Sequence, residues 1–177
     1  MSANTGALLE ERILGGQSIF LTIRNITMVD SRAKGAEGER QVRELLKKHT
    51  KLPFERVPMS GALPFMKGDL FIPDTSMNYC IEVKFYKNSH FDDKILTNKS
   101  NEFIGWWNQA VSQGELTSKK PLLFFKYNRS KIFVATTDRP ARVDKYFYIS
   151  HLGCYVMIAE EWLIHETPRF VNNGNTV

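Results

Sequence analysis

Apolar residues at helical spacing mark one segment most clearly, between positions 36 and 49. Val42 and Leu46 share one face, acidic residues occupy the early turns and lysines the last turn, as the helix dipole favours. The pattern predicts a helix. Glu39 stands at the border of its apolar stripe, three residues before Val42, and an ion pair with Arg43 or a carboxylate tip that reaches solvent would also explain this position.

The chain that follows alternates strand-like and helical patterns. A second helix is predicted between 101 and 113, where Phe103, Trp106 and Trp107 fit core positions better than base-stacking positions because they recur at helical spacing. Runs rich in β-branched and aromatic residues predict strands at 54–58, 69–72, 79–86, 121–127 and 131–136, with two more apolar runs within 145–163. This order predicts an α/β fold in which helices cover a mixed sheet.

The length and the first residues set the expected domain organisation. A chain of 177 residues with 42% hydrophobic content can bury one sizeable core. Residues 1–33 have mixed apolar content, interrupted at Gly15 and Gly16, and are expected to form a peripheral N-terminal extension, as a strand or a helix. Residues 34–177 are expected to form a single domain.

The charge balance indicates the class of partner. Lys and Arg outnumber Asp and Glu by 24 to 19, which gives a net charge of +5 and favours nucleic acid or another anionic surface. The chain lacks a run of about 18 apolar residues and the residue order of a signal peptide. We therefore expect no membrane span and a cytoplasmic location, in the host cytoplasm if the source is viral.

The cysteines give no sign of a disulfide or a zinc site. Cys80 and Cys154 each lie within an apolar strand pattern, without a CxxC motif or a histidine at zinc spacing. We expect both to be buried thiols.

The strongest candidate chemistry lies on the strand predicted at 79–86. Glu82 and Lys84 share one face of that strand, and a hairpin folded at 73–78 sets Asp69 directly opposite Glu82. Two opposed carboxylates destabilise a hairpin unless a cation lies between them, and Mg²⁺ prefers carboxylate and water oxygens. A solvated face of ion pairs would also explain a lone Glu-x-Lys.

A second aspartate, Asp74, is a less suitable candidate. It lies five residues beyond Asp69, about 16 Å along the strand from the level of Glu82 at about 3.3 Å per residue. Proline followed by aspartate is common in turns. We therefore expect Asp74 to be a turn residue, and a register slip of one residue would remove Asp69 from Glu82 as well.

Four motifs in order resemble those of a known family. The segments KGAEGERQVRELLKKH, RVPMSG, KGD and CIEVK look like those of the archaeal-type Holliday junction resolvases of the PD-(D/E)xK nuclease superfamily. The match runs from about 34 to 84, with a looser fit to about 137. The resemblance implies a restriction-endonuclease-like core of order αβββαβ, and an Mg²⁺-dependent endonuclease that cuts branched DNA as a homodimer.

The resemblance also implies roles for single residues. Glu39, Asp69 and Glu82 would gather Mg²⁺, for which Mn²⁺ is expected to substitute, while Lys84 would position or activate water. Ser60 resembles a loop serine near the scissile phosphate, although the stretch between Ser60 and Asp69 is longer than in the family. The residues expected to support the site or contact DNA are Arg40, Arg56, Lys34 and Gln109.

Two other functions remain open from the sequence. The chain could be another DNA nuclease of the same superfamily, such as a restriction-like enzyme or a recombination exonuclease. It could also be a DNA-binding module that kept the fold without activity, although the complete set of Glu39, Asp69, Glu82 and Lys84 argues against that.

Overall fold

The computed structural model describes residues 18–58, 67–97 and 101–171, and for residues 18–32 it describes the helical backbone alone. Residues Lys34–Val177 form one compact unit and Met1–Ala33 a second. Among the described helices, none is long and apolar enough to cross a membrane.

The first helix, α1, runs from Ser18 to Thr50 and is longer than the apolar pattern predicted. The segment before residue 34, which the sequence left open between strand and helix, is helical from Ser18 onward. It contains no proline, and a helix once formed adds one backbone hydrogen bond per residue without needing an apolar stripe. Near its middle, a Cβ on Gly38 would lie 2.7 Å from Cγ of Phe85, so glycine allows α1 to approach the sheet closely beside Glu39.

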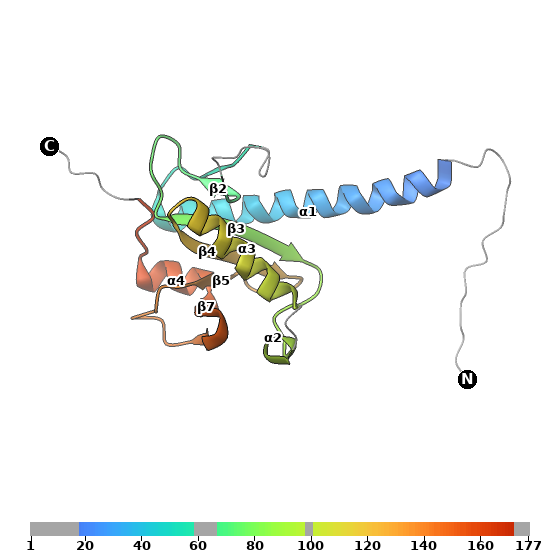
Figure 1. The fold of residues 1–177 in the computed structure, drawn as a ribbon. Coiled ribbons are helices and arrows are strands. Elements are labelled where there is room, and N and C mark those ends of the chain that lie inside the picture. The colour runs from blue at the N-terminus through green and yellow to red at the C-terminus, as the bar shows by residue number, and fades with distance from the viewer. Residues whose placement is uncertain (1–17, 59–66, 98–100, 172–177) are drawn as a thin grey trace. The chain divides into compact units, whose positions relative to one another are not determined.

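In the described part of the chain, seven strands form one mixed sheet in the order β1-β2-β3-β4-β5-β7-β6, and Figure 1 labels β2, β3, β4, β5 and β7. Strands β3 and β4 are parallel and all other neighbours are antiparallel, which confirms the predicted mixed sheet. The strand bounds are Glu55–Arg56 for β1, Leu70–Phe71 for β2, Tyr79–Tyr86 for β3, Lys120–Tyr127 for β4, Phe133–Thr136 for β5, Tyr146–Ile149 for β6 and Cys154–Ile158 for β7.

The described part of the chain contains three further α-helices. The short α2 spans Lys94–Thr97, α3 spans Glu102–Leu116 and α4 spans Ala159–Glu166. Asn101 caps α3, because its side chain accepts a hydrogen bond of 2.8 Å from the backbone N–H of Phe103. The connection through α3 lets β3 and β4 run parallel, since parallel neighbours need a crossover. The order of α1, β1, β2, β3, α3 and β4 is the predicted αβββαβ.

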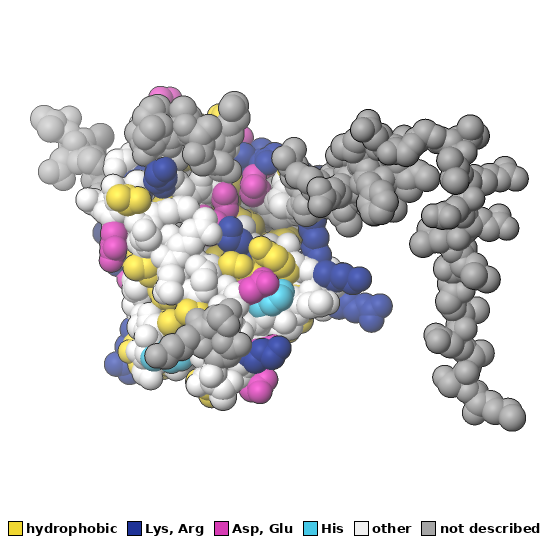
Figure 2. All heavy atoms as spheres, turned by 45° about the vertical axis from the view of Figure 1, so that its right-hand side comes forward, with side chains coloured by type: hydrophobic (Ala, Val, Ile, Leu, Met, Phe, Trp, Pro, Cys, Tyr) yellow, Lys and Arg dark blue, Asp and Glu magenta, His cyan; other side chains and the backbone are white. Residues whose placement is uncertain are grey.

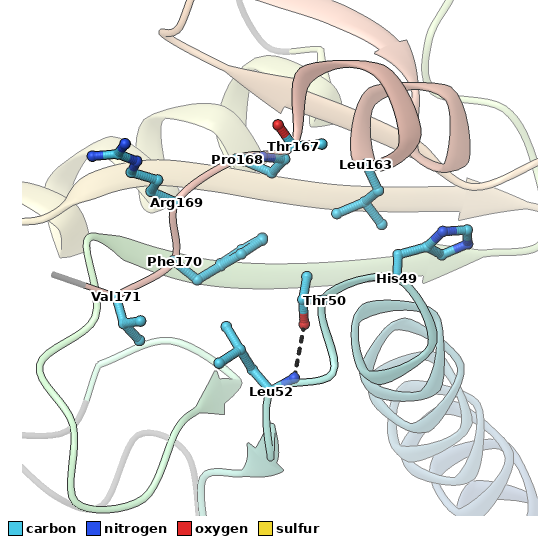
Figure 3. A pocket seen from close by; sticks show the side chains of 9 residues that line it. All are labelled: His49, Thr50, Leu52, Leu163, Thr167, Pro168, Arg169, Phe170 and Val171. Atoms are coloured by element: carbon cyan, nitrogen blue, oxygen red, sulfur yellow. Dashed lines mark hydrogen bonds between the residues drawn. The ribbon is translucent and has the colours of Figure 1, made fainter. Parts of the chain in front are cut away.

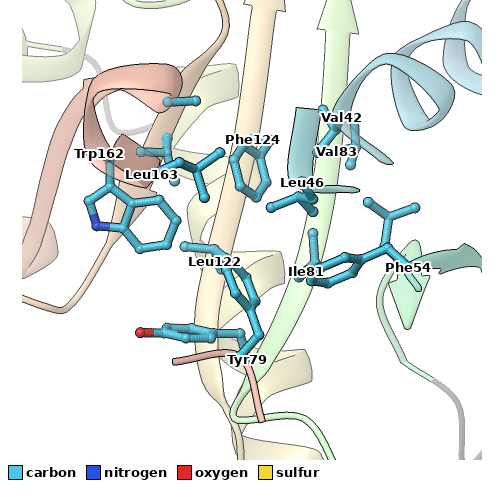
Figure 4. Packing of buried hydrophobic residues seen from close by; sticks show 14 of the residues in the cluster. Val42, Leu46, Phe54, Tyr79, Ile81, Val83, Leu122, Phe124, Trp162 and Leu163 are labelled. Atoms are coloured by element: carbon cyan, nitrogen blue, oxygen red, sulfur yellow. The ribbon is translucent and has the colours of Figure 1, made fainter. Parts of the chain in front are cut away.

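Both faces of the sheet are covered. Helices α1 and α4 pack on one face, where Val42, Leu46, Ile81, Val83, Leu122, Phe124, Trp162 and Leu163 meet (Figure 4). Helices α2 and α3 cover the other, where Phe103, Trp106 and Trp107 are buried, as predicted for core residues. The alternative of a solvated face of ion pairs does not describe this face of β3, because α3 lies over it and Glu82 is only 3% exposed.

The two thiols are free and buried, as expected. Burial raises the pKa of Cys80 and raises the pKa of Cys154 to about 12. Neither thiol therefore carries appreciable thiolate near neutral pH.

Candidate active site

The hairpin register between β2 and β3 places Asp69 at the level of Glu82. Leu70 pairs with Ile81, which is the predicted register, and Asp69 immediately precedes Leu70. The backbone N–H of Asp69 donates to the carbonyl of Ile81 at 2.7 Å. Gly68 has a φ of +89° and a Cβ there would lie 2.7 Å from the same carbonyl, so only glycine lets the chain press against β3 at this bend.

The side chain of Asp69 turns toward β3. Its Oδ2 accepts a hydrogen bond of 2.7 Å from the backbone N–H of Val83, the residue between Glu82 and Lys84. Burial, and then the neighbouring Glu82 carboxylate, raise the pKa of Asp69 to about 7. The Val83 N–H works in the opposite direction, because it stabilises the charged form. Asp69 is therefore a carboxyl group whose negative charge is poorly compensated by the protein alone.

Glu82 is the buried acceptor at the centre of the site. Its Oε1 lies 2.6 Å from Nζ of Lys84 and accepts a hydrogen bond of 2.8 Å from Nε2 of Gln109. Gln109 belongs to α3, so the helix that buries Glu82 also supplies a donor to it. Gln109, one of the predicted DNA contacts, is thus brought by the fold to the Glu82 carboxylate.

Lys84 lies two residues after Glu82 on the same face of β3 and is less buried, with 22% of its side chain exposed. Burial opposes its charge, but the Glu82 carboxylate outweighs burial, with help from Asp69 and Tyr86, and raises the pKa of Lys84. The ammonium group is therefore charged at neutral pH, beside the two carboxylates.

Glu39 has a partner other than those suggested by the sequence. Nε of Arg56 lies 2.5 Å from Oε2 of Glu39, whereas Arg43 pairs with Glu44 and Glu55. The ion pair with Arg43, one of the two alternatives for Glu39, does not form, because the tertiary fold brings β1 alongside α1. The negative charge of Glu39 also helps to raise the pKa of Asp69, after burial and Glu82.

The other predicted DNA contacts lie apart from these carboxylates. Arg40 forms an exposed ion pair with Glu37, and Nζ of Lys34 donates to Oδ1 of Asn128 at 3.2 Å. Ser60 lies outside the described residues. Asp74 is exposed in the turn after β2 with a φ of +56°, as expected for a turn residue.

Asp69 and Glu82 form a donor set suited to a divalent cation. Mg²⁺ is commonly held by one or two carboxylates, completed by waters and phosphate oxygens. A cation there would offset the repulsion that raises the pKa of Asp69. Within the described part of the chain, no group of three or more His, Cys, Asp or Glu residues is arranged to hold a metal ion. The predicted set of Glu39, Asp69 and Glu82 stays a prediction, in which Glu39 is also held by Arg56.

A pocket of about 630 Å³ lies elsewhere, where the ends of α1 and α4 meet the C-terminal segment (Figure 3). It is lined by His49, Thr50, Leu52, Leu163, Thr167, Pro168, Arg169, Phe170 and Val171. None of the predicted site residues lines it, so it is not the carboxylate site.

Basic side chains are dispersed on the face in Figure 2. Lys and Arg lie there with Asp and Glu between them. The Lys and Arg side chains coloured in that view thus form no single continuous patch.

Comparison with known proteins gives a family and two relatives. A family model described as "Phage putative PDDEXK endonuclease" matches residues 30–151, a span that contains Glu39, Asp69, Glu82 and Lys84. Protein D14 of Escherichia phage T5 is 35% identical over 150 residues, which cover 77% of this chain and 94% of that protein. Hjc, a Holliday junction resolvase from the archaeal hyperthermophile Archaeoglobus fulgidus, is similar in structure with a TM-score of 0.40 and 16% identity, over 74% of this chain and 93% of that one.

Proposed function

The chain belongs to the family of phage PDDEXK endonucleases, and from this premise we propose that it is an Mg²⁺-dependent endodeoxyribonuclease that hydrolyses phosphodiester bonds in branched DNA such as a four-way junction. The family model covers residues 30–151, and so includes the strand and helix that carry the carboxylate site. The metal, the branched substrate and a homodimeric state are the parts of this proposal that need their own tests.

One observation carries the proposal, namely the position of Asp69 beside Glu82 and Lys84. The Asp69 carboxylate is tied to the N–H of Val83, and Lys84 lies 2.6 Å from Glu82. Two carboxylates and one ammonium group thus meet beside β3. This arrangement suits an anionic substrate that approaches a metal-binding site.

Asp69 and Glu82 would hold the cation, and Mn²⁺ is expected to substitute for Mg²⁺. When bound, Mg²⁺ supplies polarisation of the phosphoryl group and a lower pKa for a water molecule. Lys84, with its raised pKa, offers a positive charge to the phosphate as negative charge develops on it. Gln109 fixes the orientation of the Glu82 carboxylate through its hydrogen bond. Glu39, paired with Arg56, would act on the site indirectly, through water or through its charge.

The preference for branched DNA rests on the four ordered motifs that resemble archaeal-type resolvases. A four-way junction presents two equivalent strands, and two equivalent cuts need two active sites related by a two-fold axis. A homodimer supplies that geometry. We therefore propose a dimer on DNA, acting in the cytoplasm, which is the host cytoplasm for a phage protein.

The experiment compares end-labelled four-way junctions with linear duplexes of the same sequences, with Mg²⁺ or EDTA. We expect Mg²⁺-dependent cuts near the branch point, which Glu82→Gln abolishes. Glu115→Gln, which changes an exposed carboxylate on α3, is the matched control and should cut normally. Equal cutting of junction and linear duplex would overturn the substrate proposal.

The product ends separate the alternative functions. An exonuclease would release short products from termini and leave closed circular DNA intact. A non-catalytic module would bind the junction with and without Glu82→Gln, and would cut it in neither case. Sedimentation of the complex with a junction would test the dimer, since a single protomer per junction contradicts it.

A further inference from the structure

Tyr86 is the last residue of β3 and continues the row formed by Glu82 and Lys84. Alternate residues of a strand share a face, so all three belong to the face that α3 covers. Tyr86 follows Lys84 by two residues, which is about 6.6 Å along a strand. In stacked DNA, two steps along one strand cover about the same distance, at about 3.4 Å each. A nucleotide beside a phosphate held at Lys84 can therefore reach Tyr86.

The Tyr86 ring is held in place from behind. It stacks on the indole of Trp106 in α3, with ring centroids 4.6 Å apart and an angle of 27° between the planes. Trp106 is 8% exposed, whereas Tyr86 is 37% exposed. A buried ring thus supports a ring that faces outward.

His90 packs against both rings but does not cover the face of the Tyr86 ring that points away from Trp106. Its ring centroid lies 5.4 Å from Tyr86 and 5.3 Å from Trp106. A ring placed over the outer face of Tyr86 would lie about twice as far from Trp106 as from Tyr86. His90 therefore packs against the edge of the stacked pair, and these two rings are the aromatic contacts of Tyr86 in the described part of the chain.

A supported and exposed aromatic ring is the usual means by which proteins hold an unpaired base. Each base offers a flat π-face, and stacking on an aromatic side chain tolerates any sequence. Within a continuous duplex both faces of a base are already stacked on neighbouring base pairs. A base that stacks on Tyr86 must therefore come from a branch point, a loop or a single-stranded segment.

We propose that Tyr86, supported by Trp106, is a platform on which an unpaired nucleobase stacks, within two nucleotides of the phosphate held at Lys84. This inference rests on the proposed nuclease function and deepens it, because it gives a physical reason for choosing branched over continuous DNA. Tyr86 is a substrate-binding residue, and the chemistry remains with the carboxylates and Lys84.

A purely structural role for Tyr86 makes a different prediction. Its ring would then only fasten α3 to β3, and its loss would lower the melting temperature without changing the choice of DNA. Tyr148 provides the matched control. It is 54% exposed, stacks on Tyr155 with centroids 4.6 Å apart and an interplanar angle of 29°, and lies on β6 at the far edge of the sheet.

The test uses the full chain carrying Glu82→Gln, so that DNA is bound and not cut. Four-way junctions and linear duplexes are titrated with this parent protein and with Tyr86→Phe, Tyr86→Leu and Tyr148→Leu added to it. We expect Tyr86→Leu to weaken junction binding by roughly 5- to 150-fold, the range given by the loss of one base–aromatic stack. Tyr86→Phe and Tyr148→Leu should bind the junction as the parent does, and duplex binding should change little in any variant.

A second measurement does not depend on how well the variants fold. Junctions with 5-iododeoxyuridine at single positions around the branch point are irradiated with the parent protein, and the crosslinked peptide is sequenced by mass spectrometry. Crosslinks at Tyr86 support the platform. Crosslinks elsewhere alone, or equal junction affinities for Tyr86→Leu and the parent, would overturn it.

The two proposals fail in distinguishable ways. Cleavage of junctions by the wild type together with Tyr86-independent binding would overturn the platform alone. Binding that depends on Tyr86, without cleavage of any DNA by the wild type, would support the platform and overturn the nuclease. If the protein binds no junction at all, both are wrong.

Discussion

The carboxylate of Asp69 accepts a hydrogen bond from the backbone N–H of Val83, at 2.7 Å. Val83 itself points into the core below α1, while Glu82 and Lys84 on either side of it point toward α3. Asp69 is therefore fixed between two functional side chains by a backbone group. The position of this carboxylate depends on the hairpin register and on the bend at Gly68, and is independent of side-chain rotamers on β3.

Replacing Asp69 by asparagine should slow cleavage strongly and spare the fold. The asparagine side chain would keep an oxygen for the Val83 N–H but lose the negative charge that holds a cation. A loss of about 3 kcal/mol of transition-state stabilisation, within the several kcal/mol that metal-ion catalysis supplies, corresponds to at least about 100-fold in rate. Single-turnover cleavage of a junction measures it.

The matched control is Asp74→Asn, at the exposed turn aspartate that follows Pro73. Asparagine tolerates the positive φ of this position, so both stability and cleavage should remain near wild type. Loss of cleavage in Asp74→Asn with normal cleavage in Asp69→Asn would show that the wrong aspartate has been assigned to the site.

The stability of the metal-free protein should decrease as pH rises toward neutrality. The pKa of Asp69 is about 7 in the folded state and near the ordinary value of about 3.9 in the unfolded state, so the folded protein retains a proton that the unfolded chain has released. The resulting stability is fully present below about pH 4 and is lost as pH rises through about 7. Urea unfolding in EDTA from pH 4 to 8 measures it against Asp69→Asn.

The free-energy difference between wild type and Asp69→Asn should thus fall between pH 4 and 7 and level off above. Mg²⁺ should reverse this trend, because a cation favours the ionised carboxylate. A difference that stays constant across this range would mean that burial and Glu82 do not raise the pKa of Asp69.

Gln109 should support cleavage by orienting Glu82. Gln109→Ala removes the donor that lies 2.8 Å from Oε1 of Glu82, and groups that orient a metal ligand typically contribute about 10- to 100-fold in metal affinity or activity. We expect a higher Mg²⁺ concentration for half-maximal cleavage. Gln113→Ala, one turn further along α3, removes only a long contact of 3.9 Å to the Cys80 thiol and should cleave as the wild type does.

Lys84→Met should cost both activity and stability. Glu82 would keep Gln109 as a donor but lose its ion-pair partner while only 3% exposed, and an under-compensated buried charge costs about 1–3 kcal/mol in free energy of unfolding. Lys84→Arg, which keeps the charge, should recover most of this stability. Equal unfolding free energies for Lys84→Met and the wild type would show that solvent stabilises the negative charge of Glu82 as well as Lys84 does.

Glu39 should affect the metal requirement less than Glu82 does. Oε2 of Glu39 lies 2.5 Å from Nε of Arg56, and its side chain is 18% exposed. Glu39→Gln should therefore raise the Mg²⁺ concentration for half-maximal cleavage less than Glu82→Gln raises it. Isothermal titration with Mn²⁺ tests this directly, and equal losses of affinity in the two variants would make Glu39 a direct ligand.

Local spacing predicted the elements around the site correctly. The strand expected at 79–86 is β3, and the hairpin register followed from counting residues across the turn, because side chains alternate with a period of two and a slip of one residue would expose the core face. The same counting separated Asp69 from Asp74. The helix that carries Glu39 was found in its last four turns, whereas the apolar residues near its start at Ser18 were not framed by caps and left strand and helix both open.

The sequence by itself therefore determined which residues share a strand face and which aspartate meets Glu82, since both depend on backbone geometry over a few residues. The tertiary structure alone decided which groups bury the charged side chains of the site and which groups pair with them. The burial of Glu82 under α3, its contact with Gln109 27 residues away and the pairing of Glu39 with Arg56 all depend on how helices pack against the sheet. Periodicity along the chain carries no information about such long-range packing. The stacking of Tyr86 on Trp106 was missed for the same reason.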